Sequence, residues 1–337
     1  MSHTEQAPWE SPDWMEGAAR WIQGVLAQHG ITQSGPIEQP HTYPWSIVLR
    51  VPTQAGMLFF KATAPLPAHE AALTQALAAW RPDCMPELLA VDLKRGWMLM
   101  RDGGKMLREV IRPDRDIEPW RPVLPLYASL QVELSDRVPQ LLALGAPDRR
   151  LATLPALYNR LLADAAIFRL DQPSGLTSDE YKRLLELKPR FAQVCADLAG
   201  CGIPESLNHG DFHDGNVLLR DGRVTFFDWG DCNLTHPFIS LRTVFVSIET
   251  SLQLEDYAFT PEMAALLDLY LEPWGRFAGR ETLLAAFQLS RCVAPIVGAL
   301  GWEPVVRSVE GDGGEKYGHI LPSLLQEFLL YESQLAA

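Results

Sequence analysis

The segments LNHGDFHDGN at residues 207–216 and FFDWG at residues 226–230 decide how this chain is interpreted. Within them, Asp211 is followed five residues later by Asn216, and Asp228 comes after the second apolar run. Carboxylate and amide oxygens are the ligands that Mg²⁺ prefers, and a carboxylate beside a hydroxyl group can orient it and take its proton. The types of these three residues make Asn216 and Asp228 candidate metal ligands and Asp211 a candidate proton acceptor.

The residues between these two segments have the pattern of a β-hairpin. Apolar residues at 217–219 and 224–227 flank the polar turn RDG at 220–222. Such a hairpin would place both metal ligands at strand ends. A lone D-x4-N pattern is also typical of a solvated surface turn, so the choice between the two interpretations depends on residues further upstream.

Upstream, an apolar strand pattern, GMLFFK at residues 56–61, ends in Lys61, and Glu70 follows nine residues later in a helical run over 68–77. Protein kinases carry their site in this order: a strand Lys on the α- and β-phosphates, a helix Glu that holds the Lys, H-R-D-x4-N, then D-F-G. Here H-x-D-x4-N starts at His209 and D-x-G starts at Asp228. The complete ordered set favours a kinase-like site over a solvated turn.

On these motifs the chain resembles the aminoglycoside phosphotransferase and choline kinase group, small-molecule kinases with a protein-kinase-like fold, over about residues 40 to 240. The resemblance implies an α+β, two-lobed fold with a small antiparallel β-sheet lobe and a larger, mostly helical lobe, and it implies ATP and Mg²⁺ as cofactors. It also assigns the site residues: Asp211 as catalytic base, Asn216 and Asp228 as metal ligands, Lys61 as the phosphate contact and Glu70 as its partner.

Three departures separate the chain from true protein kinases. Gly210 stands where they have the arginine of H-R-D, and after Gly230 the chain runs directly into the helical pattern at 239–248, without a long activation segment. A site of this kind has little with which to bind a peptide. No G-x-G-x-x-G precedes Lys61, so the turn over the phosphates falls within residues 41–46, with Ser46 as the candidate contact.

The adenine-binding hinge is expected after the apolar strand at residues 97–100, which makes Met98 and Met100 candidate nucleotide contacts. The GGK sequence at residues 103–105 resembles part of a Walker A loop. It lacks the required upstream glycine, and Met106 replaces the Ser or Thr, so a P-loop is rejected.

The acceptor is expected to bind between the catalytic loop and the late helices, through carboxylates and aromatic rings that would suit an amine or quaternary ammonium group. Most such residues are ordinary core or surface residues. The candidates are Asp214, Asp231, Trp302 and Glu303, followed by Glu272, Trp274, Glu310 and Asp312. The glycine-rich residues 310–315 are either a lid over the site or simply disordered.

At 337 residues, the length and composition predict two domains. Residues 1–101 would form a nucleotide-binding lobe with a leading helix over 11–29, strands and the Glu70 helix, and residues 102–337 a helical lobe for catalysis and substrate binding. Strands are expected at 46–51, 56–62, 87–92 and 97–100, and later helices at 151–168, 177–198, 281–300 and 322–334, with a further one beginning near residue 260.

The formal net charge of −13 argues against a nucleic-acid partner, because phosphate binding needs clustered Lys and Arg. Five cysteines without a C-x-x-C pair indicate reduced thiols and a cytoplasmic location. No apolar run reaches the ~20 residues of a membrane span, and the N-terminus has no signal pattern, so no membrane partner is expected.

Taken together, the sequence predicts an ATP- and Mg²⁺-dependent kinase that transfers the γ-phosphoryl group to a hydroxyl of a small metabolite or antibiotic, of the aminoglycoside or amino-alcohol type. The alternative is a catalytically idle, kinase-like nucleotide-binding protein. The identity of the acceptor, the choice of ATP over GTP and the oligomeric state stay open.

Overall fold

The computed structural model of the chain describes residues 7–63, 69–255, 259–308 and 316–336. The chain packs as two compact units. The first contains the chain up to Asp114 with Ala143–Ala146 and His213–Asp231, and the second contains Arg115–Leu142, Pro147–Phe212 and the chain from Cys232 onward. The predicted lobe boundary between residues 101 and 102 stays a prediction. The first packing unit continues beyond that boundary to Asp114 and also includes Ala143–Ala146 and His213–Asp231.

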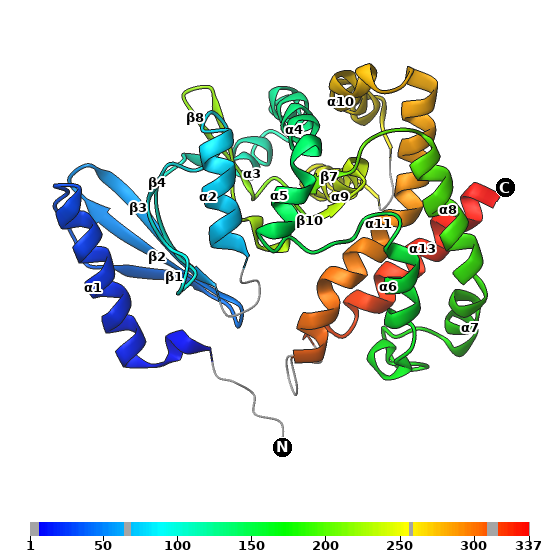
Figure 1. The fold of residues 1–337 in the computed structure, drawn as a ribbon, viewed down its shortest axis with the longest axis horizontal. Helices are drawn as coiled ribbons and strands as arrows, with labels where there is room; N and C mark the ends of the chain where they lie inside the picture. The colour runs from blue at the N-terminus through cyan, green and yellow to red at the C-terminus, as the bar shows by residue number, and fades with distance from the viewer. Residues whose placement is uncertain (1–6, 64–68, 256–258, 309–315, 337) are drawn as a thin grey trace. The chain divides into compact units, whose positions relative to one another are not determined.

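The first unit is built on a five-stranded antiparallel sheet with the order β1-β2-β3-β5-β4 (Figure 1). The sequence predicts four of its strands and misses β1, because EQPHT is polar, mostly exposed and contains a proline, which an edge strand tolerates. The strands are β1 (Glu38–Thr42), β2 (Ser46–Thr53), β3 (Gly56–Thr63), β4 (Leu88–Asp92) and β5 (Trp97–Arg101).

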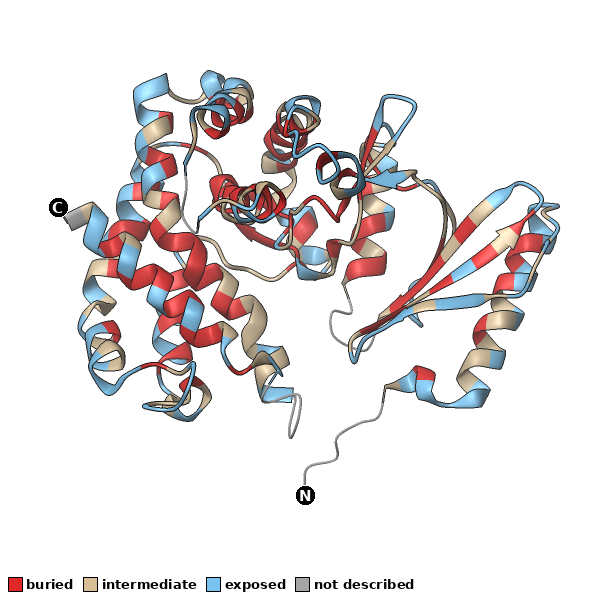
Figure 2. Cartoon of the chain, turned by 180° about the vertical axis from the view of Figure 1, so that it is seen from behind, coloured by how far each residue is buried: buried red, intermediate tan, exposed pale blue. Residues whose placement is uncertain are grey.

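Side chains alternate along the strands, so the two faces of this sheet differ (Figure 2). Leu49, Phe60 and Leu99 are directly paired across β2, β3 and β5, and they pack in one buried cluster with Ile22 of the leading helix α1 (Pro12–Gln28). Burying a side chain of this size contributes about 1.5–3 kcal/mol. One face of the sheet therefore packs against α1 in the core. The opposite face is free of α1 and carries Lys61, which is bonded to Glu70 of α2 (Glu70–Trp80).

The predicted hairpin is present, as β8 (Val217–Arg220) and β9 (Arg223–Phe226), and β6 (Lys105–Met106) pairs with β8. Its turn residues Asp221 and Gly222 both have positive φ, as a two-residue hairpin turn of type I′ requires. A Cβ on Gly104 would lie 2.2 Å from the Leu219 carbonyl oxygen. The second glycine of GGK thus lets β6 approach β8 closely.

The second unit is mainly helical (Figure 1). A two-stranded antiparallel sheet of β7 (Ser206–Asn208) and β10 (Asn233–Thr235) lies within it. The helices outside the first sheet are α3 (Leu107–Ile111), α4 (Trp120–Leu134), α5 (Val138–Ala143), α6 (Leu154–Leu161), α7 (Ser178–Glu186), α8 (Lys188–Gly200), α9 (Ser240–Leu252), α10 (Pro261–Leu271), α11 (Arg280–Ser308) and α13 (Ile320–Ala336). Short 3₁₀ turns include η3 (Ala165–Phe168), η4 (Trp229–Asp231) and η5 (Pro237–Ile239).

Two of the predicted helices are each divided. The helix expected at 151–168 is α6 followed by η3, whose start is capped by Asp164. The helix expected at 177–198 does begin with a capping box at Thr177, but it ends at Glu186, and α8 starts anew at Lys188. Pro189 explains the division, because a proline is accommodated in the first turn of a helix and not in its interior.

Helix α11 contains Pro304, which has no N–H to donate to the carbonyl of Leu300, four residues earlier. Arg149 supplies the missing donor: its guanidinium donates to the Leu300 oxygen at 2.9 Å, and it also donates to the Val297 oxygen at 3.2 Å. Within the described residues, one helix is long enough and apolar enough to cross a membrane by length and composition. This helix is α11, whose apolar window has a mean hydropathy of 1.7. Of that apolar window, 67% is buried inside the protein, which is typical of a core helix.

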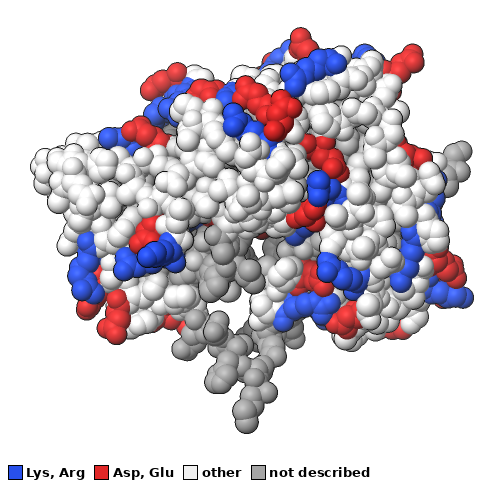
Figure 3. Space-filling model, viewed as in Figure 1, with Lys and Arg blue, Asp and Glu red and all other residues white. Residues whose placement is uncertain are grey.

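Charged side chains of both signs stand next to one another on the face drawn in Figure 3, and its described residues form no continuous basic patch. Several are paired, such as Arg307 with Asp164 at 2.5 Å. In the second unit, the guanidinium of Arg242 binds the carboxylate of Glu327 through two nitrogens, and Glu327 is only 5% exposed. A bidentate pair with one buried partner fixes α9 against α13 more firmly than exposed pairs do.

Candidate active site

Four of the predicted nucleotide contacts share one face of the first sheet. Lys61 on β3 is paired with Met98 on β5, and Met100 is two residues further along β5. Ser46 starts β2, two residues before the residue opposite Lys61. Since side chains alternate along a strand, these four point to the same side, opposite the face that packs on α1.

On this face, Lys61 is the centre of a charged cluster formed by Lys61, Glu70 and Asp228. Its Nζ lies 2.6 Å from Oε1 of Glu70 on α2 and 2.5 Å from Oδ1 of Asp228. Glu70 is 1% exposed, whereas the Asp228 side chain is 43% exposed. The lysine therefore joins a buried carboxylate to one that solvent or a ligand can reach.

The electrostatics of the cluster follow from this difference in burial. Burial lowers the pKa of Lys61, but the carboxylates of Asp228 and Glu70 outweigh it and raise that pKa above its ordinary value, so the ammonium keeps its charge. Burial raises the pKa of Glu70, and the nearby Lys61 offsets part of that rise. A fixed positive charge beside an accessible carboxylate is suited to a phosphate group together with its metal ion.

The two predicted metal ligands lie at the same end of the β8–β9 hairpin. Asn216 directly precedes β8, Asp228 follows β9 by two residues, and the Phe227 N–H donates to the Asn216 carbonyl oxygen at 3.3 Å. Asp228 has φ of 68°, in the left-handed region that non-glycine residues rarely adopt. Unusual backbone of this kind is concentrated at functional sites.

The donor set fits a magnesium ion bound largely through other ligands. Among the described residues, no cluster of three or more His, Cys, Asp or Glu is placed to hold a metal. Mg²⁺ is commonly held by one or two carboxylates with substrate phosphates and water completing its shell. One carboxylate and one amide oxygen, from Asp228 and Asn216, match that requirement.

Asp214, predicted as a substrate contact, is 2% exposed and lies against Arg108 of α3, with Oδ1 and Nη2 separated by 3.2 Å. The same Arg108 nitrogen lies 3.0 Å from Nδ1 of His213, and a Cβ on Gly215 would come within 1.9 Å of it. Arg108 thus packs directly on the three residues that precede Asn216. Nothing in the sequence marks this arginine, because α3 is short and carries no motif.

Asp211 belongs to the second unit, at the exit of β7, and its side chain is partly exposed. Its neighbour Gly210 has φ of 84°, so a glycine suits this position better than the arginine of H-R-D. His209 is fully buried. The residues that surround this segment are Tyr127, Gln131, Ser240 and Tyr270, which no sequence motif reveals.

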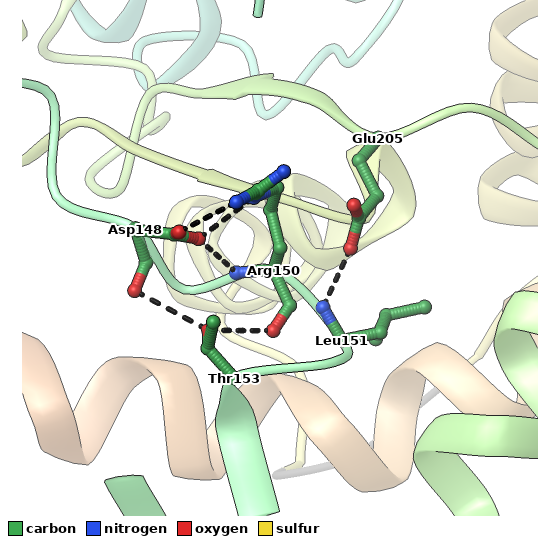
Figure 4. A network of polar contacts seen from close by, with 5 residues as sticks. All are labelled: Asp148, Arg150, Leu151, Thr153 and Glu205. Carbon is green, nitrogen blue, oxygen red and sulfur yellow. Dashed lines mark hydrogen bonds and ion pairs between the residues drawn. The ribbon is translucent and has the colours of Figure 1, made fainter. Parts of the chain in front are cut away.

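The chain that leads into β7 is fixed by a second polar network (Figure 4). Arg150 binds the Asp148 carboxylate at 2.9 and 2.8 Å, and Glu205, directly before β7, accepts a hydrogen bond from the Leu151 N–H. Burial raises the pKa of Glu205. Asp148 is also bridged to Leu234 of β10, so this network secures both strands of the small sheet.

The remaining acceptor candidates are dispersed. Asp231 is exposed at the end of η4 in the first unit, whereas Trp302 and Glu303 lie on α11 in the second. Glu303 is paired with Arg307, and the Trp302 ring stacks on Tyr317 with centroids 5.9 Å apart. Trp274 is fully buried and Glu272 is exposed. Residues 310–315 lie outside the described part of the chain.

The turn between β1 and β2 falls within the predicted residues 41–46. It contains Pro44, which has no N–H, and the Tyr43 N–H is engaged with the Ser46 carbonyl at 2.8 Å. Tyr43 and Trp45 stack with ring centroids 5.4 Å apart. In place of a glycine-rich loop that lays its amides over phosphates, this hairpin carries two aromatic rings at its tip.

Comparison with known proteins agrees with this geometry. Residues 111–266 match the family described as Phosphotransferase enzyme family. No curated protein matches the chain in sequence. Solved structures do match in fold. A choline/ethanolamine kinase family protein from Mesorhizobium loti has 16% identity and a TM-score of 0.56 over 89% of this chain and 92% of its own.

Two further structures show the same similarity. Choline kinase from Streptococcus pneumoniae has 11% identity and a TM-score of 0.58, covering 94% of this chain and all of its own. Macrolide 2′-phosphotransferase from Brachybacterium faecium has 16% identity and a TM-score of 0.55, covering 89% of this chain and 97% of its own. These matches confirm the resemblance to the aminoglycoside phosphotransferase and choline kinase group and the α+β kinase-like fold, and the family match supports the prediction of a phosphotransferase.

Proposed function

We propose that this chain is a cytoplasmic, Mg²⁺-dependent kinase that transfers the γ-phosphoryl group of ATP to a hydroxyl of a small metabolite or antibiotic. The observation that carries the proposal is the charged cluster: Lys61 bonded at once to Glu70 and Asp228, at 2.6 and 2.5 Å. A lysine held between a buried and an accessible carboxylate is the arrangement by which kinases orient phosphates and metal.

In this proposal the chain's residues divide the work between binding and transfer. Lys61 binds the α- and β-phosphates, and Glu70 keeps it in place. Ser46, Met98 and Met100 contact the nucleotide from the same face of the sheet. Asn216 and Asp228 hold Mg²⁺, which, when bound, neutralises charge on the phosphates.

Asp211 orients the acceptor hydroxyl and takes its proton at the carboxylate as the acceptor oxygen bonds to the γ-phosphorus and the bond to the β-phosphate oxygen breaks. ADP is the leaving group. Positioning and charge neutralisation would supply most of the rate enhancement, because phosphoryl transfer requires little covalent chemistry from the protein.

Several findings support the finer parts of the proposal. An amicoumacin kinase whose structure holds AMP-PNP and Ca²⁺ shares the fold, with 10% identity and a TM-score of 0.54 over 93% of this chain and 96% of its own, which supports a nucleotide and a divalent cation. The fold matches include kinases for choline and phosphotransferases for macrolides, which supports a small alcohol as acceptor. None of the five cysteines forms a disulfide bond in the part of the chain that the structure describes, as expected of a cytoplasmic protein.

The test is γ-labelled ATP with Mg²⁺ and a panel of choline, ethanolamine, aminoglycosides, macrolides, sugars and amino acids, with labelled products identified by mass. Wild type would be compared with Asp211→Ala and with Asp179→Ala, whose carboxylate is exposed in the first turn of α7. A product formed by wild type and Asp179→Ala, and lost in Asp211→Ala, supports the proposal and names the acceptor. MgATP binding without any product would instead favour the idle nucleotide-binding alternative.

A further inference from the structure

The side chain of Tyr127, in the middle of α4, contacts the chain on both sides of Asp211. Its hydroxyl oxygen accepts a hydrogen bond from the His209 N–H at 3.0 Å. Its ring stacks on the ring of Phe212, with centroids 3.8 Å apart and an interplanar angle of 18°. One buried side chain therefore fixes the backbone two residues before Asp211 and the side chain one residue after it.

We propose that Tyr127 and Ser240 are positioning residues for Asp211, holding its loop in the geometry for phosphoryl transfer. The inference rests on the proposed function for its consequence in turnover, and on the contacts alone for its consequence in loop stability. Neither residue carries charge, and neither is part of the motif that marks the site.

Counting protons gives this set of hydrogen bonds a single direction. The Ser240 hydroxyl donates its one proton to Oδ1 of Asn208 at 2.6 Å, so the 2.9 Å bond between Tyr127 and Ser240 must use the tyrosine proton. The Tyr127 oxygen is then left to accept from His209. The three hydrogen bonds run from His209 through Tyr127 and Ser240 to Asn208, and the peptide bond between Asn208 and His209 closes the ring.

A second pair of side chains holds the strand before the loop. Nε2 of Gln131 donates to the Leu207 carbonyl oxygen at 2.9 Å, and Oε1 of Gln131 accepts from the Tyr270 hydroxyl at 2.6 Å. All of these groups are buried. Burial also raises the pKa of Tyr127 above its ordinary value, so its hydroxyl keeps the proton that Ser240 requires.

The loop needs such anchors because of Gly210. This residue adopts φ of 84°, and glycine has more accessible backbone conformations than any other residue. It directly precedes Asp211. With His209 and Phe212 both fixed by Tyr127, the orientation of the Asp211 carboxylate is restricted in spite of the flexible residue beside it.

The variant Tyr127→Phe removes the hydroxyl and keeps the ring on Phe212. A matched control is Tyr158→Phe, because Tyr158 is equally buried and its hydroxyl also makes a backbone hydrogen bond, to the Leu184 oxygen at 3.0 Å. Amide hydrogen exchange of a peptide covering residues 207–212 reports the loop directly. Turnover is then measured with the acceptor found in the panel, and the thermal midpoint of each variant shows that it is folded.

We expect Tyr127→Phe to raise the exchange rate in this peptide and to lower kcat, each by about tenfold, since losing a buried hydrogen bond costs roughly the free energy of one decade. KM for ATP should change by less than about twofold, because the variant leaves the nucleotide contacts intact. Ser240→Ala should act alike, and the double variant should be no worse than the stronger single one, because both break the same ring of bonds.

The proposal is overturned if Tyr127→Phe matches Tyr158→Phe in both exchange and kcat. Faster exchange with normal kcat would also overturn it, because Tyr127 would then hold the loop without affecting phosphoryl transfer. Failure of the proposed function has a different signature: wild type itself would label no acceptor, and the exchange comparison would still decide whether Tyr127 holds the loop.

Discussion

The charged cluster of Lys61, Glu70 and Asp228 contrasts with the neutral cluster of Tyr127, Gln131, Asn208, Ser240 and Tyr270. In the first, an ion pair is buried on one side and open to solvent on the other. In the second, hydroxyl and amide groups satisfy one another entirely within the core. The charged cluster lies where a charged ligand could reach it. The backbone next to Asp211 is held instead by neutral groups, which cost less free energy to bury.

Removing the accessible carboxylate is the strongest way to test the charged side of this comparison. Asp228→Ala should lower Mg²⁺-dependent turnover on the order of 10³-fold, because a catalytic metal supplies several kcal/mol of charge stabilisation. Steady-state kinetics over a range of Mg²⁺ concentrations measure this. Unchanged turnover would exclude Asp228 as a metal ligand; Asp179→Ala, which removes an exposed carboxylate in the first turn of α7, is the control.

Separating the buried ion pair should have the next largest effect. Lys61→Met leaves Glu70 buried without its partner, so the free energy of unfolding should fall by about 3 kcal/mol, and the double variant with Glu70→Gln should recover much of it. Urea denaturation measures both. If the double variant is as unstable as the sum of the singles, the pair does not act as a unit and the charged cluster is not a coherent region.

Gly215 and Arg108 test how far the charged region extends along the loop toward Asn216. In Gly215→Ala, the new methyl group would displace the Arg108 guanidinium, which then loses its contacts with Asp214 and His213. We expect the free energy of unfolding to fall by roughly 1–2 kcal/mol and the protein to bind Mg²⁺ more weakly. Adding Arg108→Ala should cost little more. Losses that simply add would show that the arginine does not connect these residues.

The free energy of unfolding should also depend on pH through His236, a buried neutral group outside both clusters. Burial lowers the pKa of His236 from 6.5 to about 3, so the folded protein binds this proton less readily than the unfolded chain. The stability that neutral His236 preserves is therefore present above pH 6.5 and is lost as the pH falls toward 3, by up to about 1.4 kcal/mol for each pH unit.

The variant His236→Asn removes this titration and keeps a side-chain acceptor for the Phe238 N–H, which Nδ1 of His236 binds at 3.3 Å. Comparing the free energy of unfolding of both proteins from pH 7 to pH 4.5 isolates the contribution, because the carboxylates are common to both. Parallel curves would mean that His236 binds its proton equally well in the folded and the unfolded protein, and that this part of the core is not reserved for neutral groups.

The sequence predicted the charged region far better than the neutral one. Lys61, Glu70, Asn216 and Asp228 are recognisable because the kinase-like motifs allow few residue types at fixed spacings, and the segments that carry them have clear strand and hairpin patterns. Tyr127 and Ser240 could occupy any core, and only the fold brings α4, β7 and α9 together. The strand β1 was missed for a similar reason, since an exposed edge strand needs no apolar face.

The most direct measurement combines MgATP affinity and turnover for Asp211→Asn, using calorimetry for binding and the acceptor found in the panel for transfer. The two regions have separate tasks in this account, so affinity should stay within about twofold of wild type while kcat falls at least about 10²-fold. Turnover within a few-fold of wild type, or a loss of affinity as large as the loss of turnover, would contradict it.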